Sequence, residues 1–390
     1  MTVRLGVVMA EIEKGGLLPS QGPSHPCIIV AMPARPLFVL LSLLWCPGTL
    51  AGQEVMWKNL VTVYGDNTEF FTPYREGETI LGGQFFSTLA VRPARPYTIQ
   101  VGVFGDVRWG SAEFLDRVRP VLAFRYQTGH SLGVIGTLET SRRHGLLEPL
   151  AVSTLELTRP IEYGLQWREQ RPHWDAEVFI NWQALNTPTQ REVFDYGWVL
   201  RARPVRQVSL EAQFHGLHHG GQLFSAGVPV TNNAGGGFGV TLSDTIPKLG
   251  FGSIQLYRLT SSGNIDPDPP ANRPRRGRGT WVRGGLAPRR GLELFGIYWR
   301  GKDFLSQEGD NNYNSAGRLR DVYRSDRRYL ELGLLRRGRL DGGVELDAEL
   351  RFHRIDAEPS IAIRGTSWEY SYRLVVRTPF QFVLRSLDRS

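Results

Sequence analysis

Charged side chains of both signs recur at alternate positions along this 390-residue chain, and their spacing is its most chemically suggestive feature. Between residues 344 and 353, acids and bases occupy one side of the alternation and apolar residues the other. Alternate side chains of a strand share a face, so these charges would face one compartment. Opposed acids and arginines along an aqueous lumen tune its ion selectivity. The residues predicted to line such a lumen are Glu162, Arg168, Asp175, Glu177, Arg201, Arg203, Glu211, Arg283, Glu331, Glu345, Asp347, Glu349, Arg351, Glu369, Arg373 and Arg377.

The same charges have a second interpretation, in which acids and bases pair with one another and fill a closed lumen. We favour the pore because a barrel of about sixteen strands encloses an aqueous channel, whereas one of about eight is filled by its own side chains. Arginine suits a fixed lining because its charge does not titrate and its fork pairs well with carboxylates. Both interpretations stay open at this point.

The elements that must position these charges are long β-strands. Period-two alternation runs through residues 161–168, 174–184, 344–353 and 368–377, and no sustained helical period follows residue 83. Each segment is about ten residues long, which is the length a tilted strand needs to cross a bilayer. Strands of soluble sandwiches average nearer five or six residues. The length of these segments therefore predicts a transmembrane barrel.

Connections between the predicted strands alternate between short and long. Short turns such as 93–96 and 204–207 are interleaved with long segments, as between the periplasmic and external ends of outer-membrane barrels. Since the segments at 83–92 and 366–377 would both run toward the periplasm, antiparallel closure needs one more strand, for which 58–64 is the candidate. The sequence thus predicts an all-β, antiparallel up-and-down barrel of about sixteen strands, with fourteen as the alternative. The long segments are 140–156, 186–194, 218–233, 262–278 and 303–325, and those of middle length are 110–116, 243–250 and 356–365.

Tryptophans gather near the ends of the predicted strands, where interface girdles of membrane barrels lie. A half-buried core position is the alternative for each of them. The residues assigned to the girdle are Trp109, Trp167, Trp174, Trp182, Trp198, Trp281, Trp299 and Trp368.

The first 52 residues carry the features of an export signal. An apolar run at 37–46 follows Arg35 and precedes small residues around Ala51, which predicts a signal peptide over 32–52. If so, we expect Met32 to be the true first residue and residues 1–31 to be an upstream extension that the native protein lacks. A short core helix and a lipoprotein signal ending at Cys46 are the alternatives. Residues 53–82 form an N-terminal segment containing the candidate first strand, and 83–390 form the barrel.

The residues described so far resemble the porin-type outer-membrane barrels of Gram-negative bacteria, over about residues 58–384. The stretches 67–84 and 144–167 are also similar to an uncharacterised group of such barrels. This resemblance implies a fold and an outer-membrane location, and it implies no chemistry. Many such barrels end in an aromatic residue, whereas this chain continues from Phe382 to Ser390.

Other chemistries have weaker support in the sequence. The histidines between His215 and His219 lack a neighbouring acid or cysteine to complete a metal site. The acidic segment 303–325 lacks the residue order of an EF-hand calcium loop. Segment 262–278 carries several arginines, and we expect it either to narrow the lumen or to contact lipopolysaccharide. There is no nucleophile elbow, HExxH or phosphate-binding loop, so no enzyme activity, metal or cofactor is expected.

The charge pattern also bears on partners and function. The net charge is +8, but arginines and acids are interleaved without a basic stripe, so nucleic acid is not an expected partner. We expect outer-membrane lipid and lipopolysaccharide around the barrel, with small polar solutes inside. The predicted function is a porin-like channel for small polar or anionic solutes. The alternative is a non-conducting barrel that anchors a periplasmic or surface protein partner.

Overall fold

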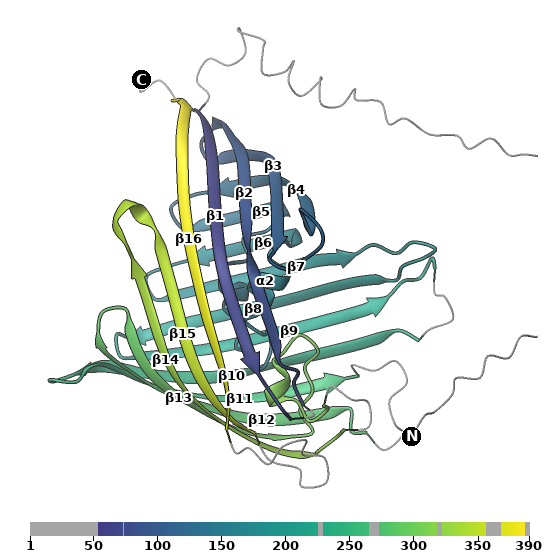
Figure 1. The fold of residues 1–390 in the computed structure, drawn as a ribbon, viewed down its shortest axis with the longest axis vertical. Helices are drawn as coiled ribbons and strands as arrows, with labels where there is room; N and C mark the ends of the chain where they lie inside the picture. Colours follow the sequence, from purple (N-terminus) through teal and green to yellow (C-terminus); the bar gives the residue numbers. More distant parts are fainter. Residues whose placement is uncertain are drawn as a thin grey trace, which may run out of the picture. The chain divides into compact units, whose positions relative to one another are not determined.

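The computed structural model describes residues 54–72, 74–224, 229–264, 273–317, 322–355 and 368–386. Figure 1 shows that these residues form one array of long antiparallel strands. The predicted signal peptide, the upstream extension and most of the arginine-rich segment 262–278 lie outside the described residues. The strands are β1 (Glu54–Glu69), β2 (Glu78–Ala94), β3 (Tyr97–Arg108), β4 (Arg117–Gln127), β5 (Ser131–Thr137), β6 (Tyr163–Gln170), β7 (Trp174–Ala184), β8 (Glu192–Val205), β9 (Val208–Gly220), β10 (Thr231–Ile246), β11 (Gly250–Gly263), β12 (Arg276–Arg289), β13 (Leu292–Lys302), β14 (Asp326–Arg339), β15 (Glu345–Ile355) and β16 (Glu369–Arg385).

The sheet closes on itself as an up-and-down barrel of sixteen strands, which confirms the predicted fold. Each strand pairs with its neighbours in sequence, and β1 pairs antiparallel with β16, with Val63 opposite Val376. The strand expected from the closure argument at 58–64 is therefore present and extends over the whole of β1. Phe382 lies within β16 opposite Trp57, and the strand continues three residues beyond it.

Short and long connections gather at opposite ends of the barrel. Three residues separate β10 from β11, so the segment 243–250, which the sequence left unclear, is mostly strand with a short turn. The long connections follow β1, β3, β5, β7, β9, β11, β13 and β15. By the pattern of outer-membrane barrels, the end that carries them is extracellular and the other end is periplasmic.

The outer face of the wall is apolar, as a surface in contact with lipid must be. Leu122, Phe238 and Ile254 point outward and are 61%, 68% and 59% exposed. The opposite, inner face of the wall carries buried polar and charged residues such as Asp106, Glu211 and Gln213. Within the described part of the chain, no helix is long and apolar enough to cross a membrane.

The tryptophans separate into two groups, and this corrects the predicted girdle. Trp281 and Trp299 face the interior and are 4% and 0% exposed, so their assignment to the girdle was wrong. The physical reason is strand parity, because Trp281 shares its face with the inward Arg283 and pairs with Trp299 across β12 and β13. Trp182 is partly buried beside outward Phe194. The exposed members are Trp109, Trp167, Trp174, Trp198 and Trp368.

Two long connections fold into the barrel instead of projecting from it. The segment between β5 and β6 contains the 3-10 helix η1 (Ser141–Gly145) and the short helix α2 (Leu155–Thr158), and Leu150 within it is fully buried. The segment between β13 and β14 contains η2 (Asn311–Tyr313). Hydrogen bonds from Val152 N to Glu308 O and from Asp310 N to Glu148 O join the two segments. A further 3-10 turn, η3 (Asp341–Gly343), closes the β14–β15 connection.

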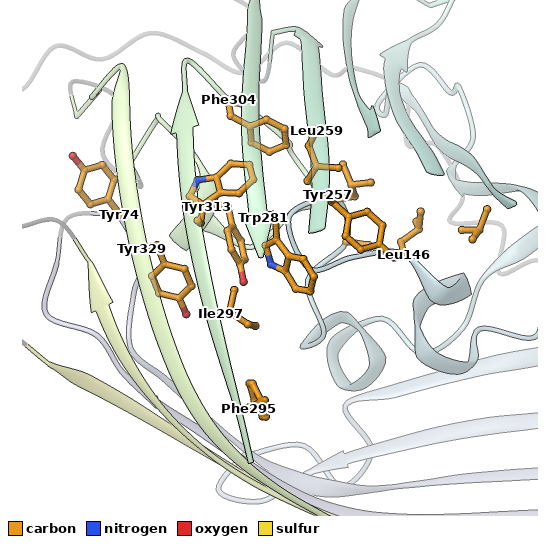
Figure 2. Packing of buried hydrophobic residues seen from close by; sticks show 14 of the residues in the cluster. Tyr74, Leu146, Tyr257, Leu259, Trp281, Phe295, Ile297, Phe304, Tyr313 and Tyr329 are labelled. Atoms are coloured by element: carbon orange, nitrogen blue, oxygen red, sulfur yellow. The ribbon is translucent and has the colours of Figure 1, made fainter. Parts of the chain in front are cut away.

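An aromatic cluster holds these segments against the wall (Figure 2). Trp299 meets Phe304 and Tyr313 edge to face, with ring centroids 5.0 and 5.4 Å apart. Edge-to-face aromatic pairs add about 0.5–1.5 kcal/mol beyond the area they bury. The interior of this barrel is therefore partly packed, and its remaining space is divided among smaller cavities.

Candidate lumen constriction

Three cavities lie one after another along the β1, β15 and β16 side of the lumen. The outer one has a volume of about 240 Å³ and is lined from the extracellular ends of β1 and β2 and from the inserted segments. The inner one is also about 240 Å³ and reaches Arg337 and Arg377 toward the periplasm. Between them lies a cavity of only about 20 Å³, which holds roughly one water molecule. We call this narrow part the constriction.

The constriction shares lining residues with both neighbours, so the three cavities adjoin one another along this side of the lumen. It shares Asp66 and Asp310 with the outer cavity. It shares Glu148 and Arg351 with the inner cavity. A solute that crosses the barrel on this side would have to pass these charges.

Arg351 is the central charge of the constriction. Its guanidinium lies 2.9 Å from Glu148, 3.0 Å from Glu331 and 2.8 Å from Glu349. Glu148 comes from the inserted β5–β6 segment, whereas the other two carboxylates come from β14 and β15. Arg351 thus ties the inserted segment to two strands of the wall, through charge-assisted hydrogen bonds of the stronger kind.

Two further ion pairs border the same space. Arg75 donates to Asp310 at 2.6 Å, and Arg373 lies 2.5 Å from Asp66. The residues around the constriction therefore include three arginines and the four carboxylates of Asp66, Glu148, Asp310 and Glu349. The formal charge of this lining is one unit negative.

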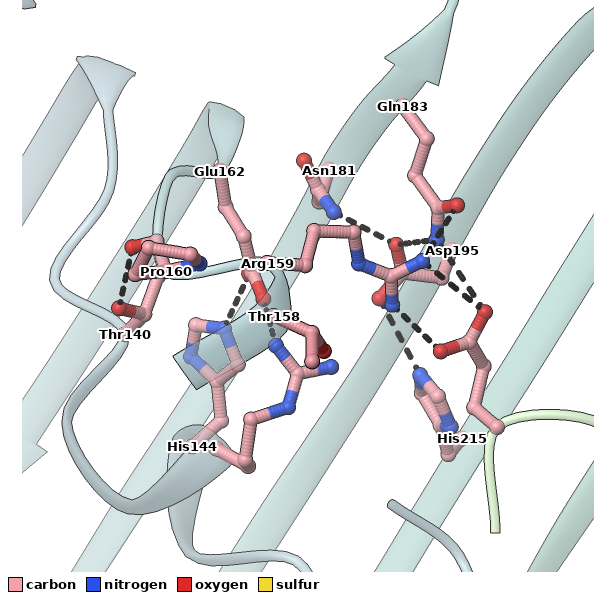
Figure 3. A network of polar contacts seen from close by, with 12 residues as sticks. Thr140, His144, Thr158, Arg159, Pro160, Glu162, Asn181, Gln183, Asp195 and His215 are labelled. Carbon is pink, nitrogen blue, oxygen red and sulfur yellow. Dashed lines mark hydrogen bonds and ion pairs between the residues drawn. The ribbon is translucent and has the colours of Figure 1, made fainter. Parts of the chain in front are cut away.

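A second polar network fixes the inserted β5–β6 segment on the opposite side of the lumen (Figure 3). The His144 ring is 2.7 Å from Glu162 through Nε2 and 2.5 Å from Glu177 through Nδ1. Arg143 also pairs with Glu162, and the imidazole stacks on Phe179 at 3.7 Å. Burial by itself lowers the pKa of His144, but the two carboxylates outweigh it, so this pKa is raised and the ring favours the charged form.

The backbone at this point is strained. Arg143 and His144 have φ values of 47° and 59°, which residues other than glycine rarely adopt. Such conformations cost roughly 1–3 kcal/mol and persist where the surroundings impose them. The paired carboxylates around His144 supply that constraint.

The two inserted segments and the wall meet in a third cluster, also drawn in Figure 3. Arg159 pairs with Glu308 of the other segment and donates to Gln183 of β7 at 2.7 Å. His215 lies 3.2 Å from Asp195 and 3.0 Å from the carbonyl oxygen of Leu150. These contacts hold both segments inside the barrel from the β7–β9 side.

The predicted lining residues all lie on inner-face positions or, for Glu162, just before β6, and many of them pair. Asp175 pairs with Arg201 and Arg203, and Asp347 pairs with Arg377. Four of them gather at or directly behind the constriction, namely Glu331, Glu349, Arg351 and Arg373.

The remainder are spread along the wall, and their role as a pore lining stays a prediction. Their other partners are Glu177 for Arg168, Arg201 for Glu211, Glu293 for Arg283, Arg339 for Glu345 and the Phe71 amide for Glu369.

Sequence reasoning missed the charges that the connecting segments supply. Asp66, Arg75, Glu148 and Asp310 lie at a strand end or in connections, where no alternation marks the inward face. Three of the four belong to or adjoin the stretches 67–84 and 144–167 that carried the family resemblance. That resemblance implies no chemistry, so it marks where three of these residues lie and not what they do.

A serine and a histidine of the constriction form a hydrogen-bonded relay that the sequence did not predict. Ser371 Oγ is 2.8 Å from His353 Nε2, and His353 Nδ1 is 2.6 Å from the Tyr329 hydroxyl. Tyr329 donates in turn to Glu331 at 2.6 Å. If the tyrosine donates to Glu331, then Nδ1 donates to the tyrosine oxygen and Nε2 accepts the serine proton. This tautomer is the one in which a histidine acts as a base toward serine.

The histidines singled out in the sequence do not form a metal site. His215 and His219 face the lumen, whereas His218 faces outward and stacks on Phe194. Throughout the described ranges, no group of three or more histidine, cysteine or acidic residues is arranged to hold a metal ion. The acidic connection 303–325 contributes Asp310 to the constriction instead.

Solved structures with this fold are outer-membrane barrels. OmpT of Vibrio cholerae, in a form lacking loop L8, matches 84% of this chain and 100% of its own, at 9% identity and a TM-score of 0.50. OprD from Pseudomonas aeruginosa matches 85% of this chain and 95% of its own, at 12% identity and a TM-score of 0.46. Such low identity shows the fold alone. No curated protein sequence matches the chain.

The closed sixteen-stranded wall and its apolar outer face are those of an outer-membrane barrel, and OmpT shares this fold. This confirms the predicted location and the general resemblance to porin-type barrels. A more specific match comes from a family model described as lipid A 3'-O-deacylase-type, which covers residues 57–387. The chain therefore belongs to the lipid A 3'-O-deacylase-type family.

Proposed function

We propose that this barrel is a narrow channel for water and small ions, with the charged constriction as its selectivity region. The observation that carries this proposal is the set of three adjoining cavities, in which two spaces of about 240 Å³ flank one of about 20 Å³. Rings of charged side chains at a narrow point are a common way to select ions. The inserted segments narrow the lumen at the constriction, so a channel through it would pass only water and small ions.

The charge of the constriction favours cations. Its lining has one more carboxylate than arginine. This cation preference differs from the small polar or anionic solutes expected from the sequence, because strand alternation places the charges of the wall but not those of the connections, such as Glu148 and Asp310. The preference is weak, since an excess of one charge beside water-filled space gives only about 1 kcal/mol at 4 Å.

Replacing Glu349 by glutamine is expected to lower the cation-to-anion permeability ratio by roughly threefold. The change removes one carboxylate from the constriction while leaving Glu148 and Glu331 beside Arg351. Reversal potentials across a planar bilayer under a potassium chloride gradient measure this ratio. Glu345→Gln is the matched control, because Glu345 lies on the same strand at the periplasmic rim, where its side chain is 43% exposed. Equal ratios for both variants and the unmodified protein would contradict the assigned selectivity region.

A second candidate function is hydrolysis of an acyl ester of lipid A, which the family description names. The specific observation in its favour is the relay from Ser371 through His353 and Tyr329 to Glu331. In such a step the serine oxygen attacks the ester carbonyl carbon and its proton passes to His353 Nε2. The sugar alcohol leaves with that proton, and water then releases the acyl group from the serine. The absence of enzyme activity expected from the sequence thus becomes an experimental question.

Ser371→Ala is expected to abolish acyl release, with a loss of about a thousandfold or more, if this second function holds. Mass spectrometry of lipid A incubated with the purified barrel measures the released fatty acid. Ser131→Ala is the control, because Ser131 binds Glu169 near the β4–β5 turn, at the other end of the barrel. If the unmodified protein releases no fatty acid, or the Ser371 variant releases as much, the esterase candidate is wrong and the channel proposal is untouched.

A further inference from the structure

The membrane-facing side of the wall carries an apolar groove that the lumen functions do not use. It has a volume of about 730 Å³ and lies over the periplasmic half of β10 to β14, with Gln207 of the β8–β9 turn at its edge. Sites that hold small organic ligands span about 300–1,000 Å³. The groove is therefore large enough for a substantial part of a lipid molecule.

Glycines open the floor of this groove between large aliphatic side chains. Gly284 of β12 is exposed, and a Cβ atom there would meet no atom of the described chain within 4 Å beyond its own neighbours in sequence. Gly296 of β13 lies beside Leu332, where a Cβ atom would make an ordinary contact at 3.4 Å. The floor thus offers space for an extended acyl chain. The aliphatic side chains around it face the membrane and are between 48% and 59% exposed, namely Leu242, Ile254, Leu294 and Leu332.

Basic residues surround the periplasmic end of the groove. Lys248 lies in the β10–β11 turn next to Leu249, which lines the groove, and Arg289 and Arg290 lie where β12 turns into β13. Arg336 faces outward on β14, and its guanidinium donates to the carbonyl oxygen of Arg290 at 3.0 Å. All four cations are exposed. In the part of the chain that the structure describes, none of them has a carboxylate within 4.0 Å.

The acids at the same end leave this rim positive. Asp244 lines the groove and lies 3.6 Å from Arg206 of the β8–β9 turn, and Asp341 is the acid of the β14–β15 connection. When Arg206 is added to the four cations, five positive charges stand against these two acids, an excess of three. The neighbouring acids on the lumen face have arginine partners of their own, namely Glu293 with Arg283, Glu345 with Arg339 and Asp347 with Arg377.

We propose that this groove binds an anionic glycerophospholipid of the periplasmic leaflet, with an acyl chain on the glycine floor and the phosphodiester at the basic rim. The occupant follows from charge complementarity and from position, because the rim lies at the periplasmic strand ends, where the headgroups of that leaflet begin. Clusters of lysine and arginine at such a level attract anionic lipid headgroups. The inference is independent of both proposed functions, since the constriction and Ser371 face the lumen.

Neutralising three rim cations is expected to weaken binding of phosphatidylglycerol by about tenfold or more. The variant, made in the full chain, exported and purified from outer membranes in detergent, is Lys248→Gln/Arg290→Gln/Arg336→Gln. The matched control removes three exposed cations from the periplasmic end of other strands, as Arg95→Gln/Arg171→Gln/Arg385→Gln. Native mass spectrometry with added phosphatidylglycerol or phosphatidylethanolamine gives the affinities.

Filling the groove is expected to weaken binding of both lipids by about fivefold or more, because the acyl chain loses the surface it covers. Gly284→Leu places a side chain in open space, so the fold is expected to tolerate it. Gly129→Leu is its matched control, because a Cβ atom at this exposed position of the β4–β5 turn also meets no described atom within 4 Å. Heat-modifiable gel mobility establishes that each variant is folded.

The unmodified protein and both controls are expected to bind phosphatidylglycerol about tenfold more tightly than phosphatidylethanolamine, and the rim variant is expected to lose this preference. Equal affinities of the rim variant and its charge-matched control for phosphatidylglycerol would overturn the proposal. Equal binding of the two lipids by the unmodified protein would overturn it as well. A dimer in the same spectra that Gly284→Leu breaks up would show that a second copy of the chain fills the groove, and the proposal would then be wrong.

Discussion

Replacing Arg351 by methionine is expected to lower the free energy of unfolding of the barrel by about 3–5 kcal/mol. The guanidinium is the shared partner of Glu148, Glu331 and Glu349, and its side chain is only 15% exposed. Removing one partner of a buried ion pair leaves the other charge without compensation, which costs more than the pair contributes. Here one substitution leaves three carboxylates close together. Urea-induced unfolding in lipid vesicles, followed by tryptophan fluorescence, measures the loss.

The control for this prediction lies on the same strand. Arg354→Met removes an exposed, outward-facing cation from β15 and is expected to change stability by no more than about 0.5 kcal/mol. Neutralising one of the carboxylates in the double variant Arg351→Met/Glu331→Gln is expected to recover part of the lost stability. If Arg351→Met unfolds at the same urea concentration as Arg354→Met, then the arginine does not hold the constriction together in the way described.

Shortening the inserted β13–β14 connection is expected to raise the single-channel conductance roughly severalfold, because it removes one wall of the constriction. Lys302 and Asp326 pair directly, so a short turn in place of residues 304–324 can join the two strands without changing their register. The change removes Asp310 from the constriction and Phe304 and Tyr313 from the interior cluster. Currents across a planar bilayer measure the effect.

An external connection supplies the comparison for this deletion. The segment between Leu185 and Glu192 carries exposed residues around an isolated bridge from Thr187 to Gln190. Shortening it is expected to leave the conductance unchanged. If both deletions give the same current as the unmodified protein, the inserted connection does not restrict the path through the lumen.

Most of the wall could be predicted from the sequence because a strand has a two-residue period. The alternation at 344–353 placed Glu349 and Arg351 on one face, and both lie at the constriction. Counting short and long connections required a strand near 58–64, and β1 is that strand. Both arguments depend only on local geometry and on the antiparallel closure of the barrel.

Trp281 and Trp299 show that strand parity outweighs nearness to a strand end. The parity that faces Arg283 inward faces Trp281 inward too. Period two was the stronger signal. A tryptophan at a strand end can pack against an inserted segment as well as against lipid, and here Trp299 packs against Phe304 and Tyr313.

The inserted segments could not be predicted because irregular backbone carries no period. Whether a connection such as 303–325 projects into solvent or folds inward depends on partners far away in sequence, and Asp310 pairs with Arg75 from the first connection. The Ser371–His353 relay likewise depends on the register between β15 and β16 and on the Tyr329 hydroxyl of β14. These contacts determine which groups lie together inside the lumen. The two-residue period determines only the strands of the wall and which of their side chains face inward.

Single-channel conductance of the unmodified protein, purified from outer membranes and inserted into a planar bilayer, tests the central claim most directly. The account predicts small, discrete current steps with a weak cation preference, because one charged constriction with room for about one water limits the path. An inserted, heat-modifiable barrel that passes no current would contradict the channel. That result would favour a closed barrel that anchors a partner, and large, unselective steps would show instead that the inserted segments do not narrow the lumen.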